Sequence, residues 1–495
     1  MLSMYNTIQH FEEVGIKKIE KIIERFVSHP TDMASFVTGI TEEVVSLGLS
    51  IISETLEDMD QQICASKKRK EKWSVVRKDC KQLKTSLGDI VFEKTLFKNK
   101  ADKHSAYLLD TILGISSHER LTEDAEQKLL EEAAESSYQK AGEDMSITSG
   151  VSKQTVKNKI HALKFKKEPE VKYADKKLVD YLYIDADEDH VSLQFQNQKG
   201  DLKKNEWNRK ENCLITKLVY VYEGIGKDAP MSKRHCLINP HYFSGAYAGT
   251  NGNDELWASV YDFIEKNYDL DHVKKVFLNG DGGAWIKAAK KKIHGITYVI
   301  DEFHLRKYML NATAHLEDSA EDARGELLNA MKKGTKAELQ EIFNRIRLSI
   351  KTESRMKRVN KSEDYFLNNW GAIRVRLTCR NQVRGCSAEG HVSHVLSSRM
   401  SSRPMGWSRT GADKMAQLLA YKWNGGDMLE LVRYQREEEV ARAAGAENDI
   451  ISSTQMLQAE RRKFGETGKY LECITHHIDT GMKKYVGLSS RIWNL

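Results

Sequence analysis

Hydrophobic and polar positions divide the chain into a helical beginning, a strand-rich middle and a helical end. Within residues 1–75, apolar side chains recur at steps of three and four (Ile16, Ile19, Ile22, Ile23), the period of amphipathic helices. The run from Ser86 to Phe97 predicts a turn and a strand, within a small segment at 76–135 that also contains a helix.

Residues 136–168 predict a helix-turn-helix. A polar turn at Ser149 and Gly150 precedes Ser152, which suits the N-cap of a second helix, 153–163, stapled by Val151 and Val156. An ordinary pair of antiparallel helices explains the segment equally well. In a DNA-binding motif, the polar face of the second helix would enter a groove with Lys153, Gln154, Lys157, Asn158 and His161.

A proline linker, 164–170, marks a domain boundary, after which the pattern changes to strands. Residues 169–308 predict the order β-β-β-α-β-α-β-α. This is the order of the ribonuclease H fold, an α/β core with a mixed sheet, whose parallel units carry sites at the carboxyl ends of their strands. The predicted elements are strands at 178–196, 214–222, 234–239, 273–279 and 296–300, and helices at 257–268, at 284–292 and from Leu305.

The rest of the chain predicts mainly helices. Residues 309–378 are charged and helical and interrupt the core, which resumes at 379–425. A helical region at 426–495 carries no chemistry that its sequence reveals.

Composition narrows the class of protein only slightly. Hydrophobic residues make up 40% and charged residues 30% of 495, as in soluble globular proteins, and we expect no membrane span and no secretory signal. The seven cysteines are odd in number and scattered, which favours a reducing cytosol. The net charge of +6 is small, but basic residues cluster at 67–70, 153–167, 290–292 and around Arg399 and Arg403, and such patches suit a polyanion. For any single cluster, a solvated surface is the alternative.

Asp281 ends an apolar strand and precedes Gly282 and Gly283. An Asp-Gly turn of a hairpin is common, but the following residues are rich in alanine and lysine, which favour a helix. The pattern therefore favours a strand, an acid and a helix in succession. The next strand ends similarly at Asp301, which can cap a helix or join the site, and His304 can orient a carboxylate, a water or a phosphate, or be an ordinary buried histidine.

Three aspartates alternate along the first core strand. Asp185, Asp187 and Asp189 share one face by their period of two. If the strand is central, at least one carboxylate is buried and needs a metal or a cation. An edge strand with a solvated acidic face is the alternative, and a Ca²⁺ loop is a weaker one because its glycine is absent.

Glu389 heads a helical run and is by itself an ordinary first-turn acid. His391 and His394, three residues apart, raise a minor zinc alternative with His304. Glu389 lies 108 residues after Asp281 (389 − 281), so sharing a site with it requires the helical block to be an insertion.

Four segments together resemble a known family. They are Ala186-Asp187-Glu188-Asp189-His190-Val191, Asn279-Gly280-Asp281-Gly282, Asp301-Glu302-Phe303-His304 and the long run from Gly385 to Met400. The chain resembles bacterial insertion-sequence transposases of the ISLre type, in the Mutator-like superfamily of DDE transposases. That superfamily has an aspartate-x-x-histidine element and a helical insertion between its second acid and its glutamate.

The resemblance implies a catalytic triad of Asp187, Asp281 and Glu389, with His304 in support, and Asp185 as the competitor for the first position. It implies Mg²⁺ or Mn²⁺ held by the three acids for phosphodiester cleavage and strand transfer. The expected partners are the terminal inverted repeats of the element, target DNA and further copies of the chain, in the cytoplasm and on the nucleoid. Arg399 and Arg403 are expected to contact phosphate.

Two other functions fit the same sequence. A non-catalytic or domesticated transposase-derived DNA-binding protein would bind DNA without strand transfer. A metal-dependent nuclease of the same fold would cut DNA but join no ends.

Overall fold

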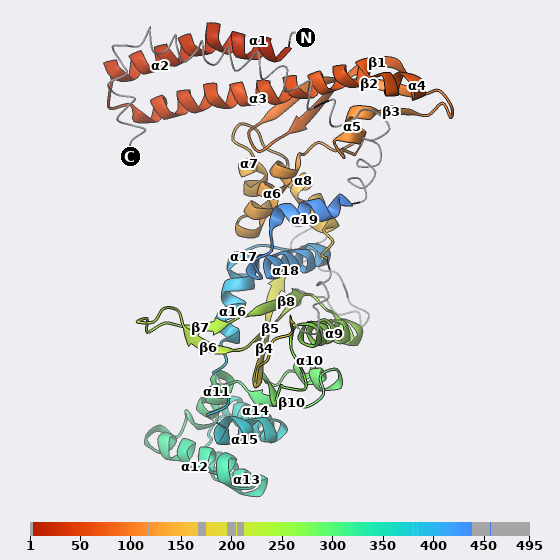
Figure 1. Ribbon diagram of the computed structural model, residues 1–495. Helices are drawn as coiled ribbons and strands as arrows, with labels where there is room; N and C mark the ends of the chain where they lie inside the picture. Colours follow the sequence, from red (N-terminus) through yellow and green to blue (C-terminus); the bar gives the residue numbers. More distant parts are fainter. Residues whose placement is uncertain are drawn as a thin grey trace. The chain divides into compact units, whose positions relative to one another are not determined.

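The computed structural model describes residues 3–116, 118–166, 175–195, 204, 212–379, 381–383, 385–437 and 456 (Figure 1). The chain divides into two units, each with a hydrophobic core. The first unit comprises Met1–Ala133, Ser137–Val156 and Met428–Leu495, and the second comprises Ala134–Ser136 and Lys157–Asp427.

The first unit begins with helices, as the apolar spacing predicts. They are α1 (Ser3–His10), a π-helical turn (Phe11–Gly15), α2 (Ile16–Ser28), α3 (Met33–Ala65) and α4 (Lys67–Lys72). By length and composition alone, α3 is apolar enough to cross a membrane, which the sequence analysis did not anticipate. Its last turns pack on a strand, where Asp60 accepts hydrogen bonds from the backbone N–H and hydroxyl of Thr95.

A three-stranded antiparallel sheet follows, in the order β1-β2-β3. Its strands are β1 (Trp73–Lys84), β2 (Asp89–Asn99) and β3 (Ser105–Tyr107). The sequence analysis predicted only the second of these. It missed β1 because that strand is largely exposed and polar, so hydrophobic alternation is absent.

The predicted helix-turn-helix residues form two helices. The helices of this region are α5 (Leu108–Ile112), α6 (Glu123–Glu135), α7 (Tyr138–Asp144), α8 (Lys153–Ala162) and α19 (Met428–Gln435). Ser152 caps α8 through Thr155 N–H at 3.3 Å, and Val156 and Ile160 are buried as predicted. The division between the units falls inside α8, after Val156, rather than in the proline linker; residues 167–170 of that linker lie outside the described chain.

The second unit is built on a five-stranded mixed sheet with the order β10-β9-β4-β5-β8. Antiparallel pairing joins β4 to β5 and β5 to β8, and parallel pairing joins β4 to β9 and β9 to β10. The predicted strand at 234–239 is not in this sheet, because it pairs with β6 (Gly224–Lys227) as β7 (His235–Ile238). The sheet strands are β4 (Tyr181–Ser192), β5 (Cys213–Tyr222), β8 (His241–Gly245), β9 (Lys275–Gly280) and β10 (Ile296–Ile300).

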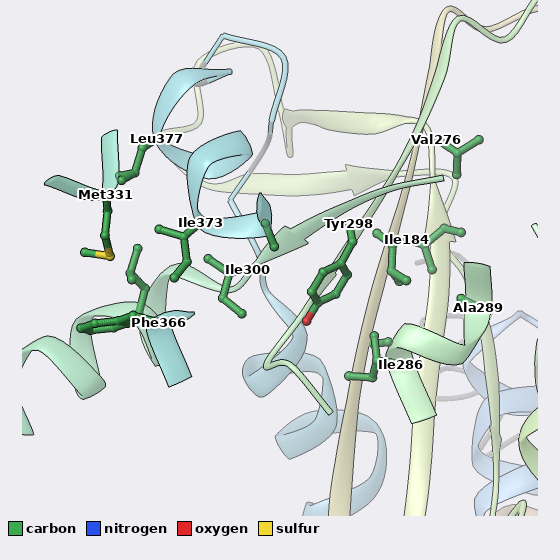
Figure 2. Close-up of a cluster of buried hydrophobic side chains, with 14 of the residues drawn as sticks. Ile184, Val276, Ile286, Ala289, Tyr298, Ile300, Met331, Phe366, Ile373 and Leu377 are labelled. Atoms are coloured by element: carbon green, nitrogen blue, oxygen red, sulfur yellow. The ribbon is translucent and has the colours of Figure 1, made fainter. Parts of the chain in front are cut away.

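Alternation along the strands gives the sheet two different faces. One face is apolar: Ile184, Val276 and Ile300 pack with residues of α9 (Gly249–Asn267) and α10 (Ala284–Lys287), and Figure 2 shows part of this cluster. The other face carries tyrosines and the aspartates of β4 and is covered by residues 382–401. The sheet therefore separates a dry core from a polar layer.

A helical insertion interrupts the fold after β10, as predicted. Its helices are α11 (Glu302–Thr313), α12 (Ala320–Lys333), α13 (Lys336–Leu348), α14 (Glu353–Asn368) and α15 (Trp370–Thr378). Met331, Phe366 and Ile373 continue the apolar core from the sheet into the insertion (Figure 2). The chain then returns over the polar face through α16 (Ala388–His391), a π-helical stretch (Val392–Ser397), α17 (Ser398–Met400) and α18 (Arg409–Trp423).

Candidate functional site

Strand register brings three aspartates to one edge of the polar layer. Asp185 is paired with Asn279 across β4 and β9, and Asn279 is paired with Val299 across β9 and β10. Asp187, Asp281 and Asp301 each lie two residues further along these parallel strands, so they share a face. The backbone N–H of Asp301 donates to the carbonyl of Gly280 at 2.9 Å, which fixes this junction. The three acids come from segments that are 94 (281 − 187) and 20 (301 − 281) residues apart.

Asp301 performs the capping role that its position suggested. Its carboxylate accepts from the backbone N–H groups of Phe303 and His304 at the start of α11, and His304 Nδ1 lies 2.9 Å from Asp301 Oδ2. The hydrogen bond to Asp301, opposed by burial, raises the pKa of His304, and the charges of Asp281 and Asp187 raise it further. A cationic imidazole is therefore favoured beside the aspartates.

Asp187 is the acid whose ionisation is most disfavoured at this edge. It is partly buried, and its Oδ1 accepts only the backbone N–H of Glu188, at 2.9 Å. Burial and the charges of Asp281 and Asp301 raise the pKa of Asp187 to about 6, against the opposing effects of that hydrogen bond and of His304. A raised carboxylate pKa at a cluster of acids is a physical indication of a functional site.

Asp185, the competitor for the first acid, has a different environment. Its side chain is fully buried, and both oxygens are taken by protein donors. Burial raises the pKa of Asp185 despite these hydrogen bonds. The donors are Tyr222 Oη (3.2 Å) and Asn279 Nδ2 (2.6 Å) to Oδ1, and Tyr220 Oη (2.8 Å) and Ser387 N–H (3.1 Å) to Oδ2.

The buried carboxylate thus exists in a form that the sequence analysis did not foresee. The sequence analysis expected a metal or a cation to compensate a buried aspartate. Neutral tyrosine, amide and backbone donors surround Asp185 instead. The available signal was the pair Tyr220 and Tyr222, which alternate on the strand next to the aspartates. A cation contributes indirectly: Arg376 of the insertion donates to Asn279 Oδ1 at 2.9 Å and to the carbonyl of Ile300.

The turn that carries Asp281 is held by the insertion. Tyr365 Oη donates to the carbonyl of Asp281 at 2.8 Å, and Gly283 N–H donates to Asp281 Oδ1 at 2.8 Å. Gly282 has φ of 105°, and a Cβ there would lie 3.0 Å from the Asn369 side chain, so glycine is required. The sequence analysis singled out this glycine but missed Tyr365 and Asn369, which are distant in sequence and sit in an ordinary helical pattern.

Glu389 lies at the start of α16, which crosses β4. Ala388 is buried, and His391 contacts the rings of Tyr220 and Tyr242 on the β5 and β8 side. At about 100° per residue, Glu389 points to the opposite side of α16 from His391. Glu389 is exposed, and within the described chain it has no hydrogen bond or ion pair.

The structure brings only part of the predicted set of site residues together. The structure brings together Asp187, Asp281, Asp301 and His304, and in the described chain it does not join Glu389 to them. Among the described residues, no group of three His, Cys, Asp or Glu side chains is poised to hold a metal ion. The carboxylates nevertheless suit Mg²⁺ or Mn²⁺ as a donor set, because a cation would stabilise the ionised carboxylate against the burial and the repulsion that raise the Asp187 pKa.

The zinc alternative finds no support in the positions of its histidines. His391 Nδ1 lies 2.9 Å from Tyr242 Oη, and His304 faces Asp301, while His394 is exposed.

The residues predicted to bind DNA differ in their exposure to solvent. Lys153, Gln154 and Asn158 are exposed on α8, and Lys157 is half-buried. His161 does not face an open groove: its Nε2 lies 3.4 Å from Ser408 Oγ, and burial lowers its pKa. The apolar spacing placed it on the polar face but could not show that the start of α18 packs there.

Of the two arginines expected to contact phosphate, Arg403 is exposed and Arg399 is not. The Arg399 guanidinium is buried 5.0 Å from the centre of the Trp407 ring, and Nη1 lies 3.7 Å from Met405 Sδ. The expectation for Arg399 was therefore wrong, because its side chain is used to pack the segment after α17.

The family model and two similar curated proteins assign the chain to the same family. Residues 30–438 match an uncharacterised protein family, UPF0236. Two UPF0236 proteins of Caldanaerobacter subterraneus subsp. tengcongensis are similar to the chain: one is 34% identical over 93% of the chain and 91% of the relative, and the other 35% identical over 92% and 91%. Their names carry eleven and four locus designations of that one bacterium, and such multiplicity is typical of proteins associated with mobile elements.

Among solved structures, a chain of the "Drosophila P element transposase strand transfer complex" is similar at 10% identity. The match covers 58% of this chain and 74% of that chain, with a TM-score of 0.19. A likeness at this score carries no argument about fold or function.

Proposed function

Because the chain belongs to the uncharacterised protein family UPF0236, whose copies recur within one bacterium, we propose that it is a DNA transposase of the DDE type. Its reaction would be metal-dependent cleavage and strand transfer of phosphodiesters at the ends of an insertion sequence. The observation that carries this proposal is the meeting of Asp187 and Asp281, with His304 beside them, just past the end of the parallel pairing of β4, β9 and β10.

The topology supports a ribonuclease H-like core. Three antiparallel strands are followed by two parallel strands, and the central β4 carries the first acid. Helices α11 to α15 separate the second acid from Glu389, as the resemblance to Mutator-like transposases implies. The insertion also contacts the site, since Tyr365 binds the backbone of Asp281.

Asp187 is the better first acid of the triad. Both oxygens of Asp185 are occupied by four donors, so Asp185 orders the polar layer instead of binding a ligand. Asp187 has one backbone donor and two carboxylate neighbours. Together with Asp281 and Glu389, it would hold Mg²⁺ or Mn²⁺, which supplies Lewis acidity and an activated oxygen nucleophile when bound.

The remaining side chains have defined tasks. Asp301 fixes the ring of His304 through Nδ1, so Nε2 is free to face the phosphate. The cationic form of His304, favoured by the surrounding acids, would stabilise negative charge on the reacting phosphodiester. The exposed face of α8 and Arg403 would contact duplex DNA, including terminal inverted repeats, and paired ends would require at least two copies of the chain. We place this activity in the cytoplasm, on the nucleoid.

Strand transfer in vitro tests this proposal. DNA carrying both flanks of the gene is incubated with the full chain and Mg²⁺, and products are resolved on a denaturing gel. We expect joined ends with Mg²⁺, none with EDTA, and none from Asp281→Asn, which should still shift the same DNA on a native gel. Cleavage without joining would identify a nuclease, binding without cleavage a DNA-binding relic, and wild-type cleavage by Asp281→Asn would refute the site.

A further inference from the structure

A second polar cluster lies in the first unit, on the three-stranded sheet. The side chains of Lys81 (β1) and Lys94 (β2) are only 7% and 6% exposed, yet their ammonium groups share one carboxylate oxygen, Asp110 Oδ2. Lys81 Nζ lies 3.3 Å from this oxygen, and Lys94 Nζ is also hydrogen-bonded to it. Asp110 Oδ1 is buried, and no described residue forms a hydrogen bond with it. Two buried ammonium groups are therefore paired with a single carboxylate, and both contact the same one of its two oxygens.

These lysines line a pocket of about 510 Å³ on the three-stranded sheet. Its wall also contains Lys84, His118 and Arg120. Arg120 is exposed, and no ion pair is found for it within the described chain.

The acids at this pocket are already paired elsewhere. Asp79 binds Arg77 at 2.9 Å and Tyr107 Oη at 2.8 Å. Glu119 is paired with Arg436 at 2.5 Å. The positive charge of Lys81, Lys94 and Arg120 therefore exceeds what the local carboxylates neutralise.

Such a cluster is costly without a further anion. Two ammonium groups near one oxygen repel each other, and charges removed from water need partners. Burial, together with the nearby Lys81, lowers the pKa of Lys94 although Asp110 opposes this. Lys94 is held in place by the Tyr107 ring, whose centre is 3.8 Å from Nζ, so the cluster is ordered before any ligand arrives.

We propose that this pocket is a phosphate-binding site, in which Lys81 and Lys94 hold one phosphate group at the base and Arg120 contacts it from the rim. A phosphate accepts several charge-assisted hydrogen bonds at once, which suits converging ammonium and guanidinium groups. The group can belong to a DNA backbone or to free phosphate. The site is independent of the aspartates of the second unit and does not rest on their proposed chemistry.

Calorimetric titration of the full chain with inorganic phosphate, at constant ionic strength, tests the site. The variants are Lys81→Gln, the rim variant Arg120→Gln and the control Lys98→Gln, an exposed lysine on β2 of the same sheet. Loss of one charged hydrogen bond weakens binding about tenfold or more. We expect that loss in Lys81→Gln, a smaller loss in Arg120→Gln and none in Lys98→Gln.

Competition identifies the source of the phosphate. If random-sequence duplex DNA displaces bound phosphate from wild type, the pocket receives a backbone phosphate; if saturating DNA leaves phosphate bound, the ligand is free phosphate. Wild type that binds phosphate no more tightly than Lys81→Gln and Arg120→Gln overturns the proposal. Should Lys81→Gln not fold, Arg120→Gln against Lys98→Gln decides the result, because both side chains are exposed.

Discussion

Replacement of Asp187 by asparagine is expected to abolish metal-dependent DNA cleavage while making the protein more stable at neutral pH. Losing a metal-binding carboxylate removes several kcal/mol of transition-state stabilisation, a fall in rate of about 10³-fold or more. The measurement is the single-turnover cleavage rate with Mg²⁺. The control is Asp180→Asn, an exposed residue immediately before the same strand, which should cleave at the wild-type rate.

The stability gain follows from the pKa of Asp187, about 6 in the folded protein against an ordinary value of 3.8. The folded state holds its proton more tightly than the unfolded state, so wild-type stability is fully present below about pH 4 and falls as pH rises through 6. The full difference is up to about 3 kcal/mol. Asparagine at position 187 does not ionise, so the variant avoids this loss of folding stability as the pH rises.

Urea unfolding without metal, at pH 4 and pH 7.5, should therefore show wild type and Asp187→Asn alike at the lower pH. The variant should be more stable at the higher pH. A variant that is less stable than wild type at pH 7.5 would show that Asp187 is not crowded by other acids.

Replacement of Asp185 by alanine should have the opposite signature, a large loss of stability. The change leaves the donors on Tyr220, Tyr222, Asn279 and Ser387 facing a buried cavity. Each unsatisfied buried group costs about 1–3 kcal/mol, and partial relaxation leaves a total of about 3–5 kcal/mol.

The free energy of unfolding in urea measures this effect. Asp180→Ala, which breaks exposed pairs with Lys274 at 2.9 Å and with His272 at 3.4 Å, should cost less than about 1 kcal/mol. If Asp185→Ala is as stable as Asp180→Ala, the hydrogen-bonded layer does not hold the sheet to residues 382–401. If it is stable and loses only cleavage, Asp185 replaces Asp187 as the first acid.

The sequence predicts the parts of this protein that depend on local pattern. The strand at 296–300 coincides with β10, and the helices of the insertion lie where charge and periodicity place them. Asp281 is identifiable because a strand, two glycines and a helix surround it. Parallel register then brings Asp301 and His304 to it, which the order of elements also predicts.

What the sequence does not reveal depends on contacts between distant segments. Asp185 and Asp187 are equivalent by period, and only the partners contributed by β5, β9 and Ser387 distinguish them. Arg399 belongs to a residue type that often binds phosphate, but its guanidinium packs against the Trp407 ring and is buried. The strand β1 has no apolar alternation, because only its last residues are buried.

The central claim is that Asp187, Asp281 and Glu389 share one divalent metal site. The most direct test measures binding of Mn²⁺ to the full chain by electron paramagnetic resonance, in the absence of DNA. The account predicts that wild type binds Mn²⁺, that Asp187→Asn and Asp281→Asn each weaken binding at least tenfold, that Glu389→Gln weakens it measurably, and that Asp180→Asn does not. Equal Mn²⁺ binding by wild type, Asp187→Asn and Asp281→Asn would contradict it.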